Sequence, residues 1–270
     1  MSSTQGVSAV IFDWAGTLVD FGSLAPMGAF VELFARHGVS IGIPEARVPM
    51  GLPKRAHVQA LAAQPRIAGA WHNAHRRAFN ESDLEQLYRE FLPMSVAAAI
   101  ERAVPIPGAV EAVAELRAKG IAVGSTTGYT RSIMEGVIAG AAQHGLQVDS
   151  VVCTDDVAEG RPSPFGVYQC MMNLGVWPAR GVIKVDDTVP GLLEGRHAGC
   201  WTVAIAASGN AAGVSLEEWS GLDAAGRESV RSAAQVVLAE AAPHWVIDSV
   251  ADLAPLLEQI EVAIRRGDMP

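Results

Sequence analysis

The stretch AVIFDWAGTLVD, residues 9–20, decides how the fold of this chain is interpreted. The apolar run Val10–Phe12 is typical of a buried strand, and Asp13 follows it directly. A loop containing Gly16 then leads back into apolar sequence. In α/β enzymes, a buried parallel strand that ends in a polar residue brings that residue to the carboxyl edge of the sheet, where ligands bind. A carboxylate there can act as a nucleophile or as a metal ligand.

The rest of the chain alternates between strand-like and helix-like patterns. Apolar runs that end in small or polar residues predict five parallel strands, at Val7–Phe12, Ile121–Gly124, Ser150–Cys153, Val182–Val185 and Trp201–Ile205. Helical periodicity fills the gaps, at Ala109–Lys119, Thr130–His144, Pro164–Asn173 and Pro190–Ala198. Glycines follow three of these helices, where C-caps are expected, at Gly120, Gly145 and Gly199. The alternation predicts a doubly wound, mostly parallel α/β sheet.

Residues 23–103 break this alternation, because they contain helix-like stretches and no convincing strand. We interpret them as a helical cap domain inserted after the first strand. The predicted helices are Met27–His37, Lys54–Ala63, Ala68–Phe79 and Glu81–Phe91. The stretch VPIPGAV, residues 104–110, then returns the chain to the sheet, so that residues 1–22 and 104–270 form the core domain. Residues 208–245 are rich in Ala and Glu and predict further helix on the flank of the core.

Composition and charge exclude several classes of protein. The net charge of −9 argues against nucleic acid or an anionic membrane surface as partner. No apolar run reaches the ~20 residues of a membrane span, and the N-terminal MSSTQG lacks the features of a signal peptide. Three cysteines without metal-type spacing are interpreted as reduced, buried small hydrophobes, at Cys153, Cys170 and Cys200. These features predict a soluble, cytoplasmic protein.

Polar groups follow four of the predicted strands. Asp13 follows the first, the hydroxyl-rich STTGYT (125–130) the second, Arg161 the third, and Asp186 and Asp187 the fourth. Hydroxyls and backbone N–H groups before a helix suit an anion, and a guanidinium suits a phosphate or carboxylate. Acidic strand ends that meet suggest a hard divalent cation such as Mg²⁺. Each feature alone is commonly a cap, a turn or a surface ion pair, but their order and spacing favour one binding site.

The segments DWAGT, STTG, GRPSP and KVDDT resemble the four motifs of the haloacid dehalogenase superfamily. The resemblance covers essentially the whole chain, and the helical insert is similar to that superfamily's first type of cap domain. Most phosphatases of the group have Asp-x-Asp as their first motif, and its second Asp protonates the leaving oxygen. Ala15 stands at that position here, so the usual proton source for cleaving a C–O–P linkage is missing.

The insert offers a different reactive group. In MGLPKRAHVQAL, residues 50–61, Lys54 stands at the start of a predicted helix and His57 lies one turn further on. A desolvated lysine near a helix N-terminus should have a lowered pKa, which makes its amine nucleophilic towards carbonyls. An imine formed there becomes an electron sink for a carbon leaving group. Without such a context, a lysine of this kind is usually solvated.

Together, DWAGT and MGLPK resemble the phosphonoacetaldehyde hydrolase family, and GSTTGYTR and IKVDDTVPGLLEGRHAGCWTV are close to that family's versions. The resemblance implies hydrolysis of phosphonoacetaldehyde to acetaldehyde and phosphate, with Mg²⁺ as cofactor. It also implies a homodimer formed through the cap domain.

The resemblance assigns a role to each candidate residue. Asp13 attacks phosphorus to give an aspartyl phosphate, and Lys54 forms the imine. Asp187, the Asp13 carboxylate and the backbone carbonyl of Ala15 bind Mg²⁺, whereas Asp186, where the family often has glycine, would act through water. The expected substrate-binding residues are Thr127 and Gly128 for the phosphonate oxygens, Arg161 for their charge, Met50 and Tyr129 as walls of the pocket, and His57 beside Lys54.

Several alternatives stay open. His57 could orient or deprotonate Lys54 or simply pack in the cap, and Met50 and Tyr129 could be ordinary core residues. The chain could also be a phosphomonoesterase of the superfamily with a rewired general acid, or a non-catalytic regulator that binds a phosphorylated ligand. The retained Asp13 argues against the regulator, and Lys54 with Ala15 argues against the esterase.

Overall fold

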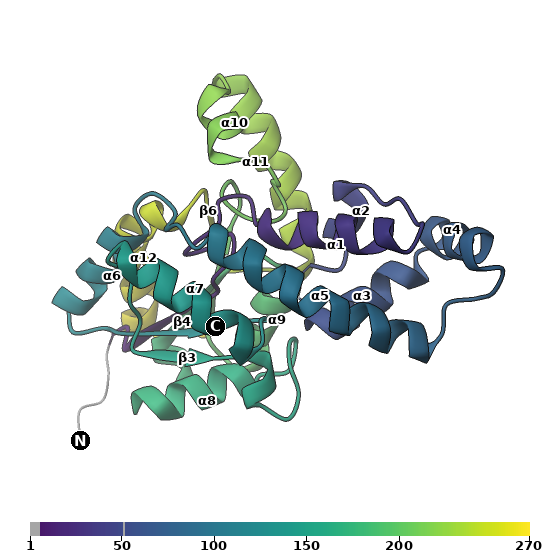
Figure 1. The fold of residues 1–270 in the computed structure, drawn as a ribbon. Helices are drawn as coiled ribbons and strands as arrows, with labels where there is room; N and C mark the ends of the chain where they lie inside the picture. The colour runs from purple at the N-terminus through teal and green to yellow at the C-terminus, as the bar shows by residue number, and fades with distance from the viewer. Residues whose placement is uncertain (1–5, 51) are drawn as a thin grey trace.

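The fold is built around a six-stranded, all-parallel sheet. A computed structural model describes residues 6–50 and 52–270. Its strands are β1 (Ala9–Phe12), β2 (Ala122–Thr126), β3 (Ser150–Val152), β4 (Val182–Asp186), β5 (Trp201–Ile205) and β6 (Trp245–Ile247). They lie in the order β3-β2-β1-β4-β5-β6, with helices on both faces (Figure 1). The predicted doubly wound parallel sheet is confirmed, and its five predicted strands differ from the observed ones by at most two residues at either end.

Strand β1 lies at the centre of the sheet, and its side chains alternate between the two faces. Val10 and Phe12 belong to the hydrophobic core that includes α6 (Ala109–Ala118), α7 (Arg131–Gln143) and α12 (Leu253–Arg266). Ala9 and Ile11 face the opposite layer, which contains α8 (Phe165–Leu174). The helix α9 (Val189–His197) covers this second face further along the sheet, beside β5. A strand buried on both faces explains why its sequence is apolar without alternation.

The first five helices after β1 form the cap. They are α1 (Ala25–Arg36), α2 (Ile43–Arg47), α3 (Lys54–Ala63), α4 (Pro65–His75) and α5 (Glu81–Glu101). They pack around a hydrophobic core of their own that includes Phe30, Phe34, Leu61 and Trp71. Figure 1 shows this helical group extending to one side of the sheet. The inserted helical cap is confirmed as part of the fold, and its boundaries at residues 23 and 103 stay a prediction.

The helices of the cap differ from the prediction in three places. The short helix α2 was not predicted. The helix predicted at Ala68–Phe79 is α4, which begins at Pro65 and ends at His75 because Arg76 has a left-handed backbone, with φ of 58°. Helix α5 does not end at Phe91 but continues through Pro93 to Glu101. Its second half is held by tertiary packing, since Ala99 belongs to the hydrophobic core of the sheet domain.

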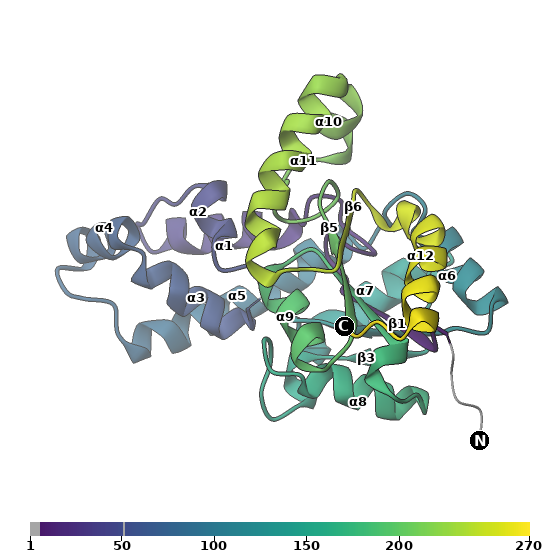
Figure 2. The same cartoon turned by 180° about the vertical axis from the view of Figure 1, so that it is seen from behind.

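The C-terminal region differs from the prediction at one strand. Helices α10 (Leu216–Gly221) and α11 (Ala224–Leu238) confirm the helical character predicted for residues 208–245, and Figure 2 shows them projecting from the body of the molecule. Trp245, however, begins β6, which pairs with β5 through Ile205 and Ile247. A three-residue strand gives too short an apolar run for sequence periodicity to identify.

Other expectations concern single residues and the chain as a whole. The three cysteines are buried and free, as predicted. Gly120, Gly145 and Gly199 all have positive φ directly after their helices, as C-capping glycines do. Among residues 6–50 and 52–270, no helix combines the length and apolar character needed to cross a membrane. The expectation about a signal peptide falls on residues 1–5, which lie outside the described part of the chain.

Candidate active site

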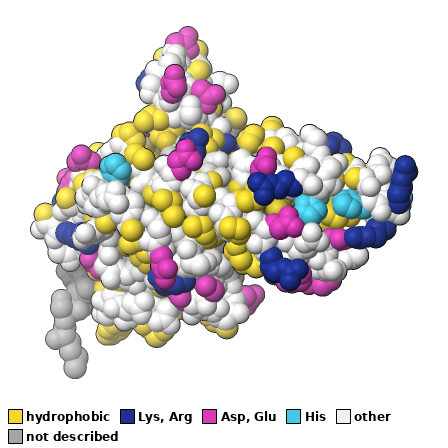
Figure 3. Space-filling view, viewed as in Figure 1, with side chains coloured by type: hydrophobic (Ala, Val, Ile, Leu, Met, Phe, Trp, Pro, Cys, Tyr) yellow, Lys and Arg dark blue, Asp and Glu magenta, His cyan; other side chains and the backbone are white. Residues whose placement is uncertain are grey.

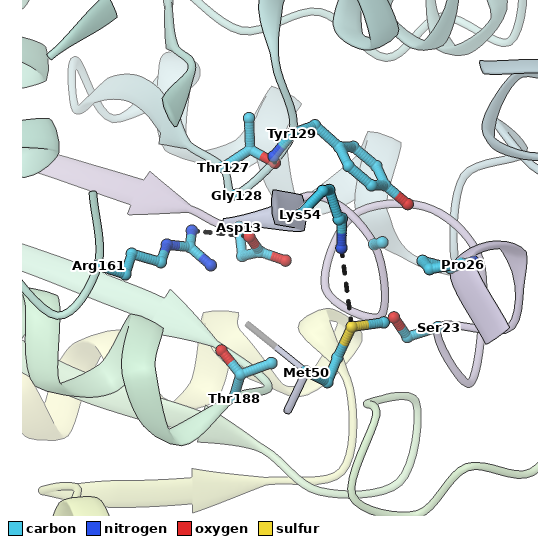
Figure 4. A pocket seen from close by; sticks show the side chains of 11 residues that line it. Asp13, Ser23, Pro26, Met50, Lys54, Thr127, Gly128, Tyr129, Arg161 and Thr188 are labelled. Atoms are coloured by element: carbon cyan, nitrogen blue, oxygen red, sulfur yellow. Dashed lines mark hydrogen bonds and ion pairs between the residues drawn. The ribbon is translucent and has the colours of Figure 1, made fainter. Parts of the chain in front are cut away.

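The carboxyl edge of the sheet meets the cap at a small cavity, shown in Figure 4. Its wall is built by the turn after β1, the loop after β2, the segment before α8, the start of α9 and the cap. The lining residues are Asp13, Ala15, Ser23, Pro26, Met50, Lys54, Thr127, Gly128, Tyr129, Arg161 and Thr188. The cavity therefore brings together predicted residues from four separate parts of the sequence. His57 and Asp187 do not line it, although Asp187 lies close to Asp13.

Three carboxylates lie at the end of β1 and β4. Asp13, Asp186 and Asp187 are buried, and one carboxylate oxygen from each lies within 4.8 Å of the others. Asp187 accepts a hydrogen bond of 2.7 Å from the backbone N–H of Asn210. Burial, together with the charges of its two acidic neighbours, raises the pKa of Asp187 well above its usual value. Asp187 is thus held close to two other carboxylates without a cation of its own nearby.

Gly16 makes this close approach possible. Its φ of +88° lies in the left-handed region, which disfavours residues with a side chain. A Cβ at this position would lie 2.2 Å from Oδ2 of Asp187. The turn after Asp13 therefore runs directly against the Asp187 carboxylate, and only glycine fits there.

Arg161 connects Asp13 to the acidic cluster. Its Nη2 donates to Oδ1 of Asp13 at 2.7 Å and to the carbonyl of Thr126 at 2.8 Å, and it lies 3.3 Å from Oδ2 of Asp186. Burial raises the pKa of Asp13 to about 6, and the Arg161 charge opposes this rise. The guanidinium is positioned to neutralise both the aspartate and an anion bound beside it.

A buried polar network lies beneath Arg161. Lys184 projects from β4 and contacts Oγ1 of Thr126 at 2.8 Å, Oδ2 of Asp186 at 2.9 Å and Oε2 of Glu194 at 3.6 Å. Oε2 of Glu194 also accepts from Arg161 Nε at 3.2 Å and from the Thr126 hydroxyl at 2.7 Å. Since each member has at least two polar contacts, the network fixes the guanidinium against Asp13.

Asp186 belongs to this network. Its Oδ1 accepts hydrogen bonds from the backbone N–H and the hydroxyl of Thr188, at 3.0 and 2.7 Å. Although burial raises it, the charges of Arg161 and Lys184 hold the pKa of Asp186 below its usual value. These contacts engage both of its oxygens with protein groups. The expectation that Asp186 acts on a metal through water stays a prediction.

The loop after β2 provides the expected anion-binding surface. Thr127 and Gly128 line the cavity just before α7 begins at Arg131. The Thr127 hydroxyl accepts a hydrogen bond of 3.1 Å from the backbone N–H of Tyr129. Ser125, which the sequence pattern placed in this loop, belongs to β2; it does not line the cavity, and its hydroxyl accepts from the indole N–H of Trp14 at 2.9 Å. The hydroxyls of this loop thus divide between the site and its support.

Lys54 is the first residue of α3, and its amine enters the cavity from the cap (Figure 4). The side chain is 5 % exposed, its Nζ lies 3.9 Å from Sδ of Met50, and it lies 4.8 Å from the centroid of the Tyr129 ring. Burial lowers the pKa of Lys54 to about 8, and the Asp13 charge opposes this effect. Almost no polar group competes for the amine, so its neutral form is accessible near neutral pH.

His57 lies one turn after Lys54 but does not line the cavity. Its Nε2 donates to the carbonyl of Ala46 at 2.8 Å, and its ring stacks on Phe30 with centroids 4.0 Å apart. Burial and the nearby Lys54 charge lower the pKa of His57 to about 3, so the ring is neutral. No direct contact joins His57 to the Lys54 amine among the described residues. This geometry supports the packing alternative.

Sequence reasoning missed several residues of this region. Ser23, Pro26 and Thr188 line the cavity, and Lys184 and Glu194 support Arg161. The sequence pattern could have identified Lys184, because a charged residue in the middle of a buried apolar strand requires a buried partner. No sequence pattern identifies Ser23, Pro26, Thr188 or Glu194, because their positions depend on how the linker and α9 pack against the sheet.

The donor set fits a hard divalent cation. Apart from Lys54 of the cap, the buried cluster contains four acids, namely Asp13, Asp186, Asp187 and Glu194, against the two bases Arg161 and Lys184. The surplus of two negative charges would be balanced by one divalent ion. All available donors near Asp13 and Asp187 are oxygens, which is the ligand type that Mg²⁺ prefers. The side chain of Ala15 offers no donor, so any contribution from this residue has to come from its backbone.

Comparisons with known proteins identify the family of the chain. The model of the haloacid dehalogenase-like hydrolases matches residues 7–199. The chain is 49% identical to a phosphonoacetaldehyde hydrolase of Paraburkholderia phytofirmans over 98% of this chain and 99% of that protein. It is 44% identical to a protein of the same name from Vibrio cholerae, over 98% of each chain.

Solved structures agree in fold. A phosphonoacetaldehyde hydrolase-like protein from Oleispira antarctica superposes with a TM-score of 0.96 at 41% identity, covering 98% of this chain and 96% of that one. A β-phosphoglucomutase from Clostridium difficile has a TM-score of 0.66 at 14% identity, covering 95% of this chain and 97% of that one, and shares the fold alone.

Proposed function

The chain belongs to the haloacid dehalogenase-like hydrolases and, within them, to the phosphonoacetaldehyde hydrolase family, and from this membership we propose that it hydrolyses the P–C bond of phosphonoacetaldehyde. The products would be acetaldehyde and phosphate. One observation carries the proposal: a buried lysine amine with a pKa of about 8 shares a small cavity with Asp13, and Ala15 provides no acid for a leaving oxygen. A site for phosphate esters would need that acid, whereas a site for a phosphonoaldehyde needs the amine.

The first proposed step is imine formation. The neutral amine of Lys54 adds to the aldehyde carbon and water leaves, which gives a protonated imine adjacent to the carbon that carries phosphorus. The walls formed by Met50 and Tyr129 exclude competing polar groups from the amine. This step requires a deprotonated lysine, and the lowered pKa makes a minor fraction of that form available at neutral pH.

The second proposed step breaks the P–C bond. An Asp13 oxygen attacks phosphorus, and the bonding pair moves onto carbon and is accepted by the iminium nitrogen as an enamine forms. Arg161 balances the charge that Asp13 and the phosphonate bring together, and Thr127 and Gly128 hold the phosphonate oxygens. The enamine then gains a proton on carbon, and water releases acetaldehyde from Lys54. A second water releases phosphate from Asp13, so that one water is consumed overall.

Asp13, Asp187 and the Ala15 carbonyl would hold a Mg²⁺ ion. When bound, the ion would supply positive charge that stabilises the oxygens of the transferring phosphoryl group. This assignment is supported by the surplus of negative charge in the buried cluster and by the raised pKa of Asp187. Without the ion, Lys184 and Arg161 would not balance the negative charges of the four acids and a bound phosphonate.

The cap would have to move during each turnover. The cavity has a volume of about 30 Å³. Since one water needs at least about 10–15 Å³, the closed site holds about two waters and no substrate. Opening of the cap would admit the substrate, and closure would bring Lys54 to the aldehyde and exclude bulk water. A homodimer and a cytoplasmic location, both expected from the sequence, belong to the same proposal.

The test combines product release with trapping. Phosphonoacetaldehyde and a panel of phosphate monoesters are each assayed for phosphate release, with and without Mg²⁺. The proposal expects release from phosphonoacetaldehyde far above release from any ester. Borohydride added with the substrate should inactivate the enzyme and leave a reduced adduct on the Lys54 peptide. The chain has only three lysines, Lys54, Lys119 and Lys184, so peptide mass spectrometry assigns the adduct directly.

Two variants complete the test. Lys54→Arg keeps the positive charge but cannot form the imine, so phosphate release should fall by more than about 10³-fold. Lys119→Arg is the matched control, because Lys119 is exposed and paired with Glu115, and it should keep full activity. Unmodified protein after borohydride, or a Lys54→Arg enzyme with good activity, would refute the imine. Faster release from an ester than from the phosphonate would favour the phosphomonoesterase.

A further inference from the structure

Arg47, the last residue of α2, joins the cap to the sheet domain. Its Nη1 donates to the backbone carbonyls of Gly22 at 2.9 Å and of Asn210 at 3.1 Å, and its Nη2 donates to the carbonyl of Gly213 at 3.0 Å. Gly22 lies in the linker between β1 and α1, whereas Asn210 and Gly213 lie in the loop after β5. We name residues 208–213 the 208–213 loop. One guanidinium of the cap thus binds the linker and this loop at the same time.

Other arginines of the cap make their contacts within the cap. Arg55 pairs with Glu85 of α5, and Arg66 pairs with Glu45 of α2. Figure 3 shows charged side chains of both signs gathered on the outer surface of the cap. Arg47 differs, because the three carbonyls that it binds lie outside the cap helices. Backbone carbonyls at fixed positions match the planar fork of a guanidinium, so these contacts depend on how the cap sits on the sheet domain.

The 208–213 loop connects Arg47 to the catalytic carboxylates. The backbone N–H of Asn210 donates to Oδ2 of Asp187 at 2.7 Å. The loop also lies directly against this carboxylate, because a Cβ at Gly209 would lie 2.5 Å from Cβ of Asp187. A shift of the loop would therefore remove the hydrogen bond that orients Asp187 and change its position relative to Asp13.

The linker that Arg47 binds has a strained backbone. Asp20, Gly22 and Ser23 all have positive φ, of 56°, 83° and 51°. Residues with a side chain disfavour this region, so the linker keeps its shape only while surrounding contacts hold it. Arg47 supplies one such contact at the carbonyl of Gly22, and the N–H of Gly22 donates to the carbonyl of Ser208 at 2.7 Å. Loss of Arg47 would therefore release the linker on which the cap turns.

We infer that Arg47 is a positioning residue that holds the cap closed over the site and, through the 208–213 loop, keeps Asp187 in place. The inference rests on the cap movement of the proposed function. Arg47 does not line the cavity, so it acts through the loop and the linker and not on the substrate. Opening of the cap would withdraw the guanidinium from all three carbonyls. Closure would then bring Lys54 into the site and fix Asp187 in one movement.

Removal of the guanidinium is the first test. Arg47→Ala should lower kcat for phosphonoacetaldehyde by at least about tenfold, because the closed cap loses several hydrogen bonds from a charged donor. Small-angle X-ray scattering should give a larger radius of gyration for this variant than for the wild type. Millimolar guanidinium should restore part of its activity, which would not follow from a general loss of packing. Arg66→Ala is the matched control, since Arg66 contacts α2 only from within the cap, and it should behave like the wild type.

A second variant displaces the guanidinium without removing it. A Cβ at Gly213 would lie 2.7 Å from Cζ of Arg47, so Gly213→Ala should reproduce both the opening and the loss of kcat. In the Arg47→Ala background the same substitution should change kcat by no more than about twofold, because the clashing group is gone. Fully additive losses would show that the two residues act independently and would contradict the inference.

Hydrogen exchange measures the loop directly and requires no activity. Peptides that contain residues 208–213 should exchange at least about tenfold faster in Arg47→Ala than in the wild type, because their contact with the cap is lost. An Arg47→Ala protein with the kcat, the radius of gyration and the exchange rates of the wild type would overturn the inference. So would a loss of kcat without opening and without rescue by guanidinium. Failure of the proposed function has a different signature: the wild type would release no phosphate from phosphonoacetaldehyde, and scattering and exchange would still test Arg47.

Discussion

Burial of Lys54 in the cavity predicts that the native residue destabilises the folded protein at neutral pH. The pKa of Lys54 falls from 10.5 to about 8, with burial as the main cause. Each pKa unit corresponds to about 1.4 kcal/mol, so holding the protonated amine in the fold costs roughly 3 kcal/mol. Replacing Lys54 with Met keeps an unbranched side chain of similar length and removes the charge. At pH 7 the free energy of unfolding should therefore rise by about 3 kcal/mol, while phosphate release is lost.

The sign of the pH dependence follows from the two pKa values. Between pH 8 and 10.5 the unfolded chain still holds the proton on Lys54 and the folded chain has lost it. Unfolding then takes up a proton, so the stability of the wild type rises with pH across this window. Below pH 8 both states are protonated and the cost is constant. The advantage of Lys54→Met should thus be largest below pH 8 and should vanish near pH 10.5.

Urea unfolding in EDTA at pH 7 and pH 10 measures this difference, since chelation removes any contribution from bound metal. Lys119→Met is the control, because Lys119 is exposed and should change stability by no more than about 0.5 kcal/mol. If Lys54→Met unfolds at the same or a lower urea concentration than wild type at pH 7, the amine is not desolvated. The reasoning for its reactivity would then fail as well.

Four further perturbations test the site. Asp13→Asn should lower phosphate release by more than about 10³-fold, because an amide cannot attack phosphorus, and turnover within tenfold of wild type would contradict the role of Asp13. EDTA should silence the enzyme and Mg²⁺ should restore it, and full activity in metal-free buffer would mean that the acidic cluster serves another purpose. Gly16→Ala should raise the Mg²⁺ concentration needed for half-maximal activity by at least about tenfold, because the new Cβ would lie 2.2 Å from Oδ2 of Asp187. An unchanged Mg²⁺ titration would argue against a metal ion at Asp187. Lys184→Met should lower the free energy of unfolding by about 3–5 kcal/mol in urea titrations, because the buried carboxylates of Asp186 and Glu194 lose one of their cations. A decrease below about 1 kcal/mol would show that the charge of Lys184 does not hold the network together.

Local sequence patterns were sufficient for most of the architecture. The strand Trp201–Ile205 and the helix Lys54–Ala63 have the predicted bounds, because each is a periodic run with clear ends. Errors occurred where tertiary contacts override local preference. Helix α5 passes through Pro93, which a local rule places at a helix end, because its second half is packed on the sheet domain. Strand β6 exists because β5 offers it a hydrogen-bonding edge.

The sequence by itself determined which chemical groups stand at the strand ends, because the residue after a parallel strand always comes to the carboxyl edge of its sheet. That rule brings Asp13 and Asp187 together although they are far apart in the chain. Only the tertiary structure decided which groups surround them. The amine of Lys54 lies in a small cavity, and the ring of His57 packs away from it, because the cap's own core fixes the rotation of α3. Likewise, Phe165, Tyr168 and Met172 of α8 have the spacing of an ordinary core face, and they are exposed because the sheet covers the opposite side of that helix.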